Sequence, residues 1–222
     1  MGSFMAKIIR RVVIFLVIVL GFGYYQWNMY EQKTQMREDA LLYFGEEDYT
    51  KSIQYFEEAL GKRALFSDEM NKDMNCYLAE SYYCLGEYNK AVEIYDRLLE
   101  EDDTNVMYYH LKGECQSAAG KDEEAVEVFK EGYEKTGKPD LLKEICDIYI
   151  TQENYEKALE YALKGAGDNE EPPKELLYQT IIIYEKSQNY EAALQAAKEY
   201  CERYPEDKEA QKELVFLSTR VE

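Results

Sequence analysis

The chain has 222 residues, and its 45 acidic against 26 basic side chains give a net charge of −19. A surface this acidic repels phosphate groups, which disfavours nucleic-acid binding and contact with anionic lipid headgroups. The length suits one sizeable domain or a stack of about five helical pairs. Only 4 prolines occur, and strand-type alternation is hard to find, so the sequence predicts an all-α chain.

The amino-terminal stretch, residues 8–27, predicts a single transmembrane signal-anchor helix that follows a short basic tail, residues 1–7. Its centre, Val12–Leu20, is an unbroken apolar run. Three basic residues lie on its amino-terminal side: Lys7, Arg10 and Arg11. Trp27 and Tyr30 follow where an aromatic interfacial belt would lie. The whole stretch reaches the roughly 20 residues that a spanning helix needs.

The charge distribution around this stretch predicts an orientation. Because positive flanks stay on the cytoplasmic side, we expect a cytoplasmic amino terminus and an extracytoplasmic body at a bacterial cell membrane. A cleaved signal peptide is one alternative, since Gly21–Gly23 has a small-x-small pattern. A body facing the cytoplasm is another, because the odd number of cysteines indicates free thiols rather than disulfides. All five fall in predicted helices: Cys76, Cys84, Cys115, Cys146 and Cys201.

The sequence offers little for catalysis, cofactors or metals. His110 is the only histidine, and no Cys-x-x-Cys pair occurs, so we expect no metal site. No glycine-rich phosphate loop is present. Cys115, five residues after His110, is poorly placed to form a nucleophile–base pair with it. We therefore expect a protein that is not an enzyme and that takes no cofactor and no small-molecule substrate.

The strongest pattern is a repeat with a period near 34 residues. Small residues recur at intervals of 39, 34, 33 and 35 residues: Ser52, Ala91, Ala125, Ala158 and Ala193. Similar heptapeptides surround three of them, Leu85–Ala91, Gln152–Ala158 and Ser187–Ala193. Each copy has a helix, a short break at glycine or polar residues, and a second helix. Such units cannot bury their apolar faces alone, so they stack.

These repeats resemble the tetratricopeptide repeat family. The resemblance implies an α-solenoid of about five helical hairpins over residues 28–207, with repeats at about 33–66, 72–105, 106–138, 139–172 and 174–207. The first interval is five residues longer than the family period, which predicts an extended link near residues 61–71. Residues 208–222 predict an amphipathic capping helix and tail that cover the last hairpin.

The resemblance also implies a concave groove lined by the first helix of each hairpin. Carried over by position, the candidate peptide-groove residues are Leu41, Phe44, Glu80, Tyr83, His110, Glu114, Lys143, Asp147, Tyr178, Ile182 and Glu185. The basic clamp by which some family members bind a terminal carboxylate is missing, because Arg37, His110 and Lys143 are isolated cations. Glu80, Glu114 and Asp147 instead occupy matching sites, which predicts an acidic stripe and a basic partner. A surface that is acidic everywhere would also place acids here.

The expected function is therefore a membrane-anchored adaptor or scaffold for a peptide or partner helix. The layout resembles that of anchored repeat proteins that accompany the protein-export channel, which implies a role in secretion or in assembly of envelope complexes. A structural solenoid that self-assembles without a peptide ligand is the alternative from a different class, although the charged capping helix argues against it.

Overall fold

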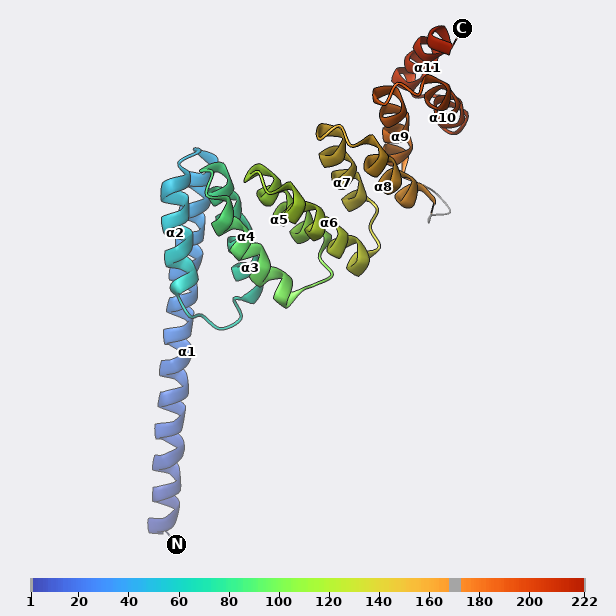
Figure 1. The fold of residues 1–222 in the computed structure, drawn as a ribbon. Helices are drawn as coiled ribbons and strands as arrows, with labels where there is room; N and C mark the ends of the chain where they lie inside the picture. Colours follow the sequence, from blue (N-terminus) through green and yellow to red (C-terminus); the bar gives the residue numbers. More distant parts are fainter. Residues whose placement is uncertain (1, 168–172, 222) are drawn as a thin grey trace. The chain divides into compact units, whose positions relative to one another are not determined.

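The computed structural model describes residues 2–167 and 173–221, and helices make up nearly all of them (Figure 1). The helices are α1 (Gly2–Gly45), α2 (Tyr49–Gly61), α3 (Asp68–Cys84), α4 (Tyr88–Glu101), α5 (Val106–Ala118), α6 (Asp122–Thr136), α7 (Asp140–Thr151), α8 (Tyr155–Gly167), α9 (Lys174–Lys186), α10 (Tyr190–Arg203) and α11 (Lys208–Val221). The predicted all-α fold class is confirmed. The end of the fourth predicted repeat, residues 168–172, lies outside the described residues.

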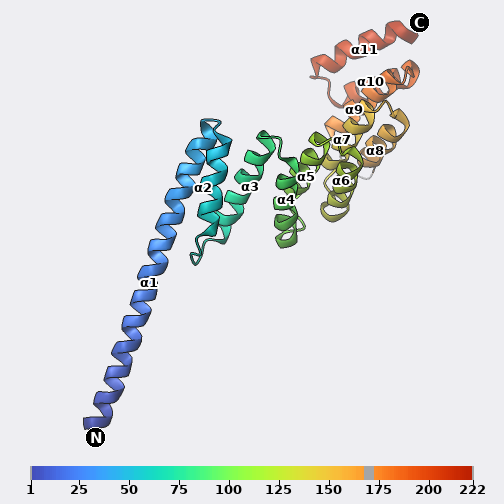
Figure 2. The ribbon, with the colours of Figure 1, turned by 60° about the vertical axis from the view of Figure 1, so that its left-hand side comes forward.

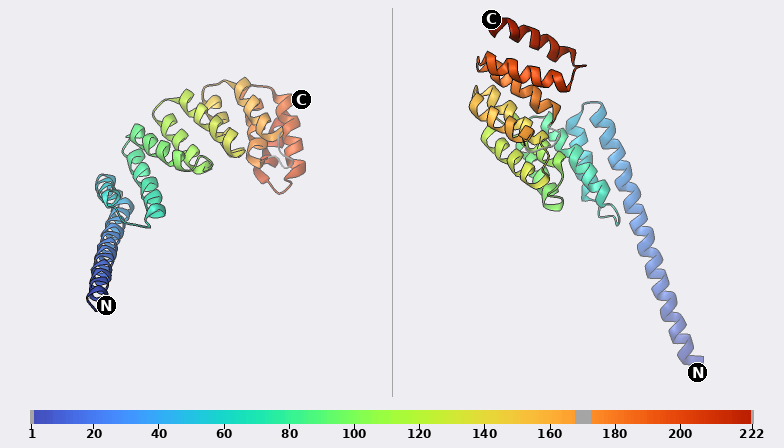
Figure 3. Two further views of the ribbon diagram at one scale, coloured as in Figure 1. Left: turned by 90° about the horizontal axis from the view of Figure 1, so that it is seen from below. Right: turned by 90° about the vertical axis from the view of Figure 1, so that its right-hand side faces the viewer.

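The chain forms two compact units, residues 1–94 and 95–222, and the boundary between them falls inside α4. In unit 1, α2 packs against the carboxy-terminal part of α1, and α3 packs against both (Figure 2). In unit 2, α5 to α11 each pack against the next described helix in sequence, as Figure 3 shows for α9, α10 and α11. Each unit is therefore a stack of helical hairpins.

Five hairpin turns have the same backbone conformation. In each, one residue takes the left-handed conformation: Glu47, Gly86, Gly120, Glu153 and Gln188. The following N–H then donates to a carbonyl near the end of the first helix, for example from Asn154 to Tyr149 at 2.8 Å and from Asn189 to Tyr184 at 2.8 Å. This is the bond pattern that closes a helix in the Schellman motif. Repetition of one turn explains why the hairpins recur at nearly constant length.

The small residues that define the period are the points where the helices touch. Ser52, Ala91, Ala125, Ala158 and Ala193 are all fully buried, at 0% exposure. A larger side chain at these positions would force the neighbouring helices apart, because protein interiors are close-packed. In unit 2, larger residues of α5, α6 and α7 fill the space between hairpins: Tyr109, Phe129, Leu141, Leu142 and Ile145. The repeat period of the sequence therefore equals the spacing along the chain between successive helix–helix contacts.

The amino-terminal region differs from the expectation. One 44-residue helix, α1, continues without a break from Gly2 through the predicted tail and anchor into the first hairpin. None of the helices in the described part of the chain is long and apolar enough to cross a membrane, so the predicted transmembrane helix over residues 8–27 is not supported. The unbroken apolar run, Val12–Leu20, would rise only about 14 Å, against the roughly 30 Å of a bilayer core.

The expectation of free thiols rather than disulfides is confirmed, but the five cysteines differ in their burial. All five carry free thiols, and Cys115 and Cys146 are buried. Burial raises the pKa of each of these two thiols to about 12. Cys84, by contrast, is exposed at the end of α3.

The last helix is held by Asp207, which precedes α11. Its carboxylate accepts from the N–H of Ala210 at 3.2 Å and from the Tyr200 hydroxyl at 2.9 Å, and it lies 2.9 Å from the Lys174 ammonium. These contacts, the one with Lys174 foremost, hold the pKa of Asp207 at about 2. One side chain thus connects α9, α10 and the start of α11.

We expect this contact to make the stability of unit 2 depend on pH. An unperturbed aspartate titrates near pH 4, according to model peptides. Because folding depresses the pKa of Asp207, its contribution is fully present above about pH 4 and is lost as the pH falls towards about 2. Urea unfolding followed by circular dichroism should show a smaller loss of stability over this window for Asp207→Asn than for wild type. Equal losses in the two proteins would contradict the role of Asp207.

Candidate protein-binding surface

The first helices of successive hairpins lie beside one another within each unit. In unit 1, α1 contacts α3, and in unit 2, α5 contacts α7 and α7 contacts α9. Each unit has its own inner face, which we define as the exposed side of these helices that carries the candidate residues. They are Leu41, Phe44, Glu80 and Tyr83 in unit 1, and His110, Glu114, Lys143, Asp147, Tyr178, Ile182 and Glu185 in unit 2. None of the eleven is buried, so all are placed where a partner could reach them.

The inner face of unit 1 is largely aromatic. Phe44 is half-buried, and its ring meets those of Tyr49 and Tyr77 edge-on, at centroid distances of 5.6 and 5.3 Å. Tyr83 is exposed, and its ring lies 5.3 Å from that of Tyr88. Leu41 of α1 is half-buried, and Glu80 of α3 is exposed. Unit 1 therefore offers an apolar surface with a single candidate acid.

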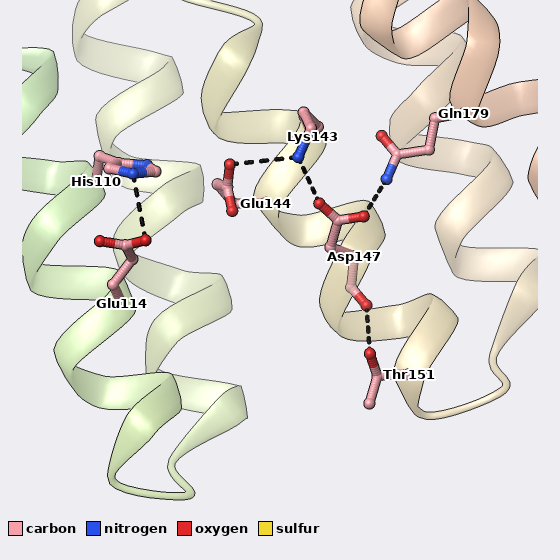
Figure 4. A network of polar contacts seen from close by, with 7 residues as sticks. All are labelled: His110, Glu114, Lys143, Glu144, Asp147, Thr151 and Gln179. Atoms are coloured by element: carbon pink, nitrogen blue, oxygen red, sulfur yellow. Dashed lines mark hydrogen bonds and ion pairs between the residues drawn. The ribbon is translucent and has the colours of Figure 1, made fainter. Parts of the chain in front are cut away.

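The inner face of unit 2 carries a polar network centred on Asp147 (Figure 4). The Lys143 ammonium lies 2.6 Å from one carboxylate oxygen of Asp147, and Gln179 donates to the other at 2.5 Å. Lys143 also lies 3.7 Å from Glu144. Burial tends to lower the pKa of Lys143, but the bond to Asp147 and the two nearby carboxylates raise it overall. Lys143 is therefore a charged partner of Asp147.

This pairing alters the expected acidic stripe. Lys143 and His110, expected to be isolated, each have an acidic partner one helical turn away, and His110 lies 3.5 Å from Glu114. Arg37 pairs with Asp73 of α3 at 2.5 Å. The charge of Asp147 is compensated locally. The other two acidic candidates of unit 2, Glu114 and Glu185, form no ion pair with a lysine or arginine among the described residues.

Gln179 is a residue of this network that the sequence pattern did not indicate. The candidates on α9 were Tyr178, Ile182 and Glu185, which are half-buried. Gln179 is only 5% exposed and bridges α9 to α7 through Asp147. Its carbonyl oxygen is buried without a hydrogen-bond partner in the described structure. The only signal in the sequence was a polar residue among apolar ones on α9.

The capping helix adds acidic character to the end of this face. Burial, together with the neighbouring Glu185 carboxylate, raises the pKa of Glu213 on α11. Tyr178 packs against Tyr200 with ring centroids 5.4 Å apart. Burial and the acids around it, Glu213 first among them, raise the pKa of Tyr178. A cation placed beside Glu185 would relieve the repulsion between Glu185 and Glu213.

The chain is similar to known families of helical-repeat proteins. A family model described as tetratricopeptide repeat matches residues 146–208, and one described as anaphase-promoting complex, cyclosome, subunit 3 matches residues 48–132. A crystallised tetratricopeptide repeat protein from Parabacteroides merdae is 14% identical, with a TM-score of 0.60 over 86% of this chain and 74% of that one. The chain is built from tetratricopeptide-like repeats.

Further similarities support these tetratricopeptide-like repeats. The MamA protein is 16% identical with a TM-score of 0.58, over 81% of this chain and 95% of its own. A TPR repeat-containing protein of Methanocaldococcus jannaschii is 28% identical over 127 residues, or 57% of this chain. ER membrane protein complex subunit 2-A of Xenopus laevis is 33% identical over 72 residues, or 32% of this chain. The matches span only 22% and 24% of these two relatives.

Unit 2 also contains a cavity away from the candidate residues of α5 and α7. This cavity of about 280 Å³ lies between α8, α9 and α10, where Leu163, Thr180 and Arg203 are among its walls. Within residues 2–167 and 173–221, no group of His, Cys, Asp or Glu side chains could hold a metal ion.

Proposed function

We propose that this chain is a protein-interaction scaffold that holds a basic, partly apolar peptide or partner helix on the inner face of unit 2. The observation that carries the proposal is the row of half-buried side chains on α5, α7 and α9, among them Glu114 on α5 and Glu185 on α9. Between these two helices, the charge of Asp147 on α7 is compensated by Lys143, and Figure 4 shows this pair together with Glu114. Tetratricopeptide repeat proteins are generally adaptors without enzymatic activity, which agrees with this proposal.

The names of two matches support a role within a larger protein assembly. One family model is named for a subunit of the anaphase-promoting complex, and one relative is named as a subunit of an ER membrane complex. Neither name says what this chain binds. We propose only the shared principle, that tetratricopeptide-like hairpins hold another protein in place within a larger assembly, here one that serves secretion or the cell envelope.

We further propose that the amino-terminal part of α1 attaches the chain to a membrane. Its apolar side chains from Val12 to Leu20 are all exposed, and burying them in an apolar medium is favourable. This proposal concerns attachment and does not require α1 to cross the bilayer. The single-pass topology, with an extracytoplasmic body, stays a prediction.

A pair of matched charge reversals tests the binding proposal. The probe is a fluorescein-labelled synthetic peptide of alternating lysine and leucine, titrated with the full chain in fluorescence anisotropy. We expect Glu114→Lys/Glu185→Lys to weaken binding about tenfold, since complementary charges favour the complex and like charges oppose it. The control, Glu123→Lys/Glu127→Lys, makes the same change of net charge on exposed positions of α6.

The control should bind within about twofold of wild type, or less than about 0.5 kcal/mol. Equal weakening by the two variants would mean that the peptide responds to overall charge, and the inner face would lose its special role. No binding by wild type would remove the basic peptide as the partner.

A further inference from the structure

The connection between α2 and α3 is the longest described link between hairpins. It spans six residues, 62–67, whereas α4–α5 and α6–α7 are joined by residues 102–105 and 137–139. It is two residues longer than the α4–α5 link, whereas α3, with 17 residues against 13 in α5, is four residues longer, so most of the extra length in the first repeat interval lies in α3. The predicted extended link near residues 61–71 is therefore shorter than expected, because α3 begins at Asp68. Connecting loops on the surface of a stacked repeat often carry a role of their own.

This α2–α3 loop is fixed to α1 rather than free. The Lys33 ammonium donates to the carbonyl of Lys62 at 3.0 Å, and the Leu65 N–H donates to the Gln26 side-chain oxygen at 3.0 Å. Lys33 is only 1% exposed, and burial lowers its pKa. Ser67, also buried, donates to the carbonyl of Ala64 at 2.9 Å. A buried lysine and two further bonds hold the loop in one conformation.

The fixed loop holds two large apolar side chains out into solvent. Leu65 is 50% exposed and Phe66 is 96% exposed. Phe66 has a φ of 58°, a left-handed conformation that is unfavourable for a bulky residue. The backbone is thus strained at the very residue that leaves its ring uncovered. Within the described structure, Phe66 keeps 96% of its surface open to solvent, which points to an external apolar partner.

The loop continues an apolar surface of α1. Leu65 and Phe66 line a hollow of about 440 Å³ together with residues of α1: Phe22, Gly23, Gln26, Trp27 and Tyr30. Figures 1 and 2 show the loop beside α1, below the point where α2 ends, and no other helix of unit 1 lies beside the amino-terminal half of α1. Trp27 is 65% exposed, and tryptophan and tyrosine prefer the water–lipid boundary.

The distribution of exposed apolar side chains around α1 indicates which kind of partner would cover them. Every residue of Val12–Leu20 is exposed, and nine consecutive residues pass around the whole circumference of a helix. A docked protein helix would cover one face, whereas acyl chains surround a helix on all sides. Lys62 and Arg63 precede the exposed pair in the loop, where they could reach lipid phosphates.

We propose that Leu65 and Phe66 insert into the boundary region of a phospholipid bilayer beside Trp27, so that the α2–α3 loop is a second membrane contact. The inference rests on the membrane attachment of α1 proposed above. It adds a second point of contact, the α2–α3 loop, to that attachment. A single helix can rotate about its own axis at a membrane, but a second contact fixes one side of unit 1 against the surface. The inner face of unit 1 would then have a set direction relative to the bilayer.

Trp27 makes the test direct, because it is the only tryptophan in the chain. The full chain is mixed with phosphatidylcholine vesicles that carry bromine near the headgroup end of the acyl chains, and tryptophan quenching is measured. We expect quenching of wild-type Trp27. We also expect it for Trp27→Phe/Phe66→Trp, whose single tryptophan sits in the loop. Trp27→Phe/Val215→Trp is the matched control, since Val215 of α11 is 65% exposed and should stay unquenched.

A second pair of variants measures the energetic role of the loop by vesicle co-sedimentation. Leu65→Asp/Phe66→Asp should weaken binding about tenfold or more, because two apolar side chains no longer enter the lipid. Leu163→Asp/Val215→Asp, at exposed positions of unit 2, should bind as wild type does.

The outcomes separate the two proposals. Absence of quenching at wild-type Trp27 would overturn membrane attachment itself. Quenching at Trp27 without quenching at Phe66→Trp, or unchanged binding by the Leu65/Phe66 variant, would overturn the loop contact and leave the attachment standing. If instead Trp27 becomes shielded as the protein concentration rises without vesicles, a second copy covers this surface and the lipid inference is wrong.

Discussion

Replacing Gly113 with alanine will destabilise unit 2 by about 1–3 kcal/mol, the usual cost of an overpacked core. Gly113 of α5 is buried against the ring of Phe129 of α6, which is 2% exposed. A Cβ on Gly113 would lie 2.3 Å from one ring carbon of Phe129 and 2.4 Å from the next. Moving the ring or separating the two helices would cost free energy, because the ring also packs in the core with Tyr109 and Leu141. The urea midpoint of the full chain, followed by circular dichroism, should fall.

Two further variants make this prediction specific. Gly167→Ala, at the end of α8, adds a methyl group with nothing within 4 Å, so it should leave the midpoint unchanged or raise it slightly. Gly113→Ala/Phe129→Leu removes the ring that the methyl group meets and should recover part of the loss. A midpoint for Gly113→Ala equal to that of wild type would show that α5 and α6 are packed more loosely than the structure indicates.

The hairpins could be predicted from the sequence because their physical requirements are local and repeated. Close contact between two helices needs a small residue, and that need placed Ser52, Ala91, Ala125, Ala158 and Ala193 at a nearly constant interval. The longer interval between Ser52 and Ala91 was only partly understood, because most of its extra residues lengthen α3, which begins at Asp68, and few lie in the link before it. The pattern reports contacts between neighbouring segments, and those contacts are present.

The polar network of the inner face was harder to foresee, since it depends on helix rotation. One residue along a helix turns the side chain by about 100°, so the choice between Tyr178 and Gln179 depends on where α9 begins. Pro172 and Pro173 leave that start ambiguous in the sequence. Lys143 and Asp147 are four apart, a spacing that permits an ion pair. Whether the pair forms depends on the side chains around it, here Gln179 and Glu144.

The amino-terminal helix shows a different limit. An apolar run flanked by arginines predicts a separate anchor, yet α1 continues as one helix into the first hairpin. Helix propagation is favourable once a helix exists, and residues 28–32 contain neither glycine nor proline to stop it. Sequence patterns mark where a helix should be apolar more reliably than where it should end.

Reversing the charge of Asp147 will destabilise unit 2 by about 1–3 kcal/mol, the cost of leaving a buried polar group unpaired. In Asp147→Lys, the Gln179 amide, which is 5% exposed, loses the carboxylate to which it donates at 2.5 Å. The new ammonium also faces Lys143. The ion pair itself contributes less, because both side chains are more than a third exposed and water screens their charges. Urea unfolding of the full chain measures the loss, and it should precede any binding experiment with this variant.

A variant that exchanges the charges of Lys143 and Asp147 keeps the net charge and tests whether the orientation of the polar network matters for stability. Lys143→Asp/Asp147→Lys restores an ion pair of opposite polarity and removes the repulsion between the two ammonium groups of Asp147→Lys, but the Gln179 amide still lacks the carboxylate to which it donates. Part of the stability should therefore return, as a double-mutant cycle measures. If the swap stays as unstable as Asp147→Lys, the original orientation of the Gln179 amide is required. If Asp147→Lys alone is as stable as wild type, Asp147 is not a packing residue, and its exposed charge is available to a partner.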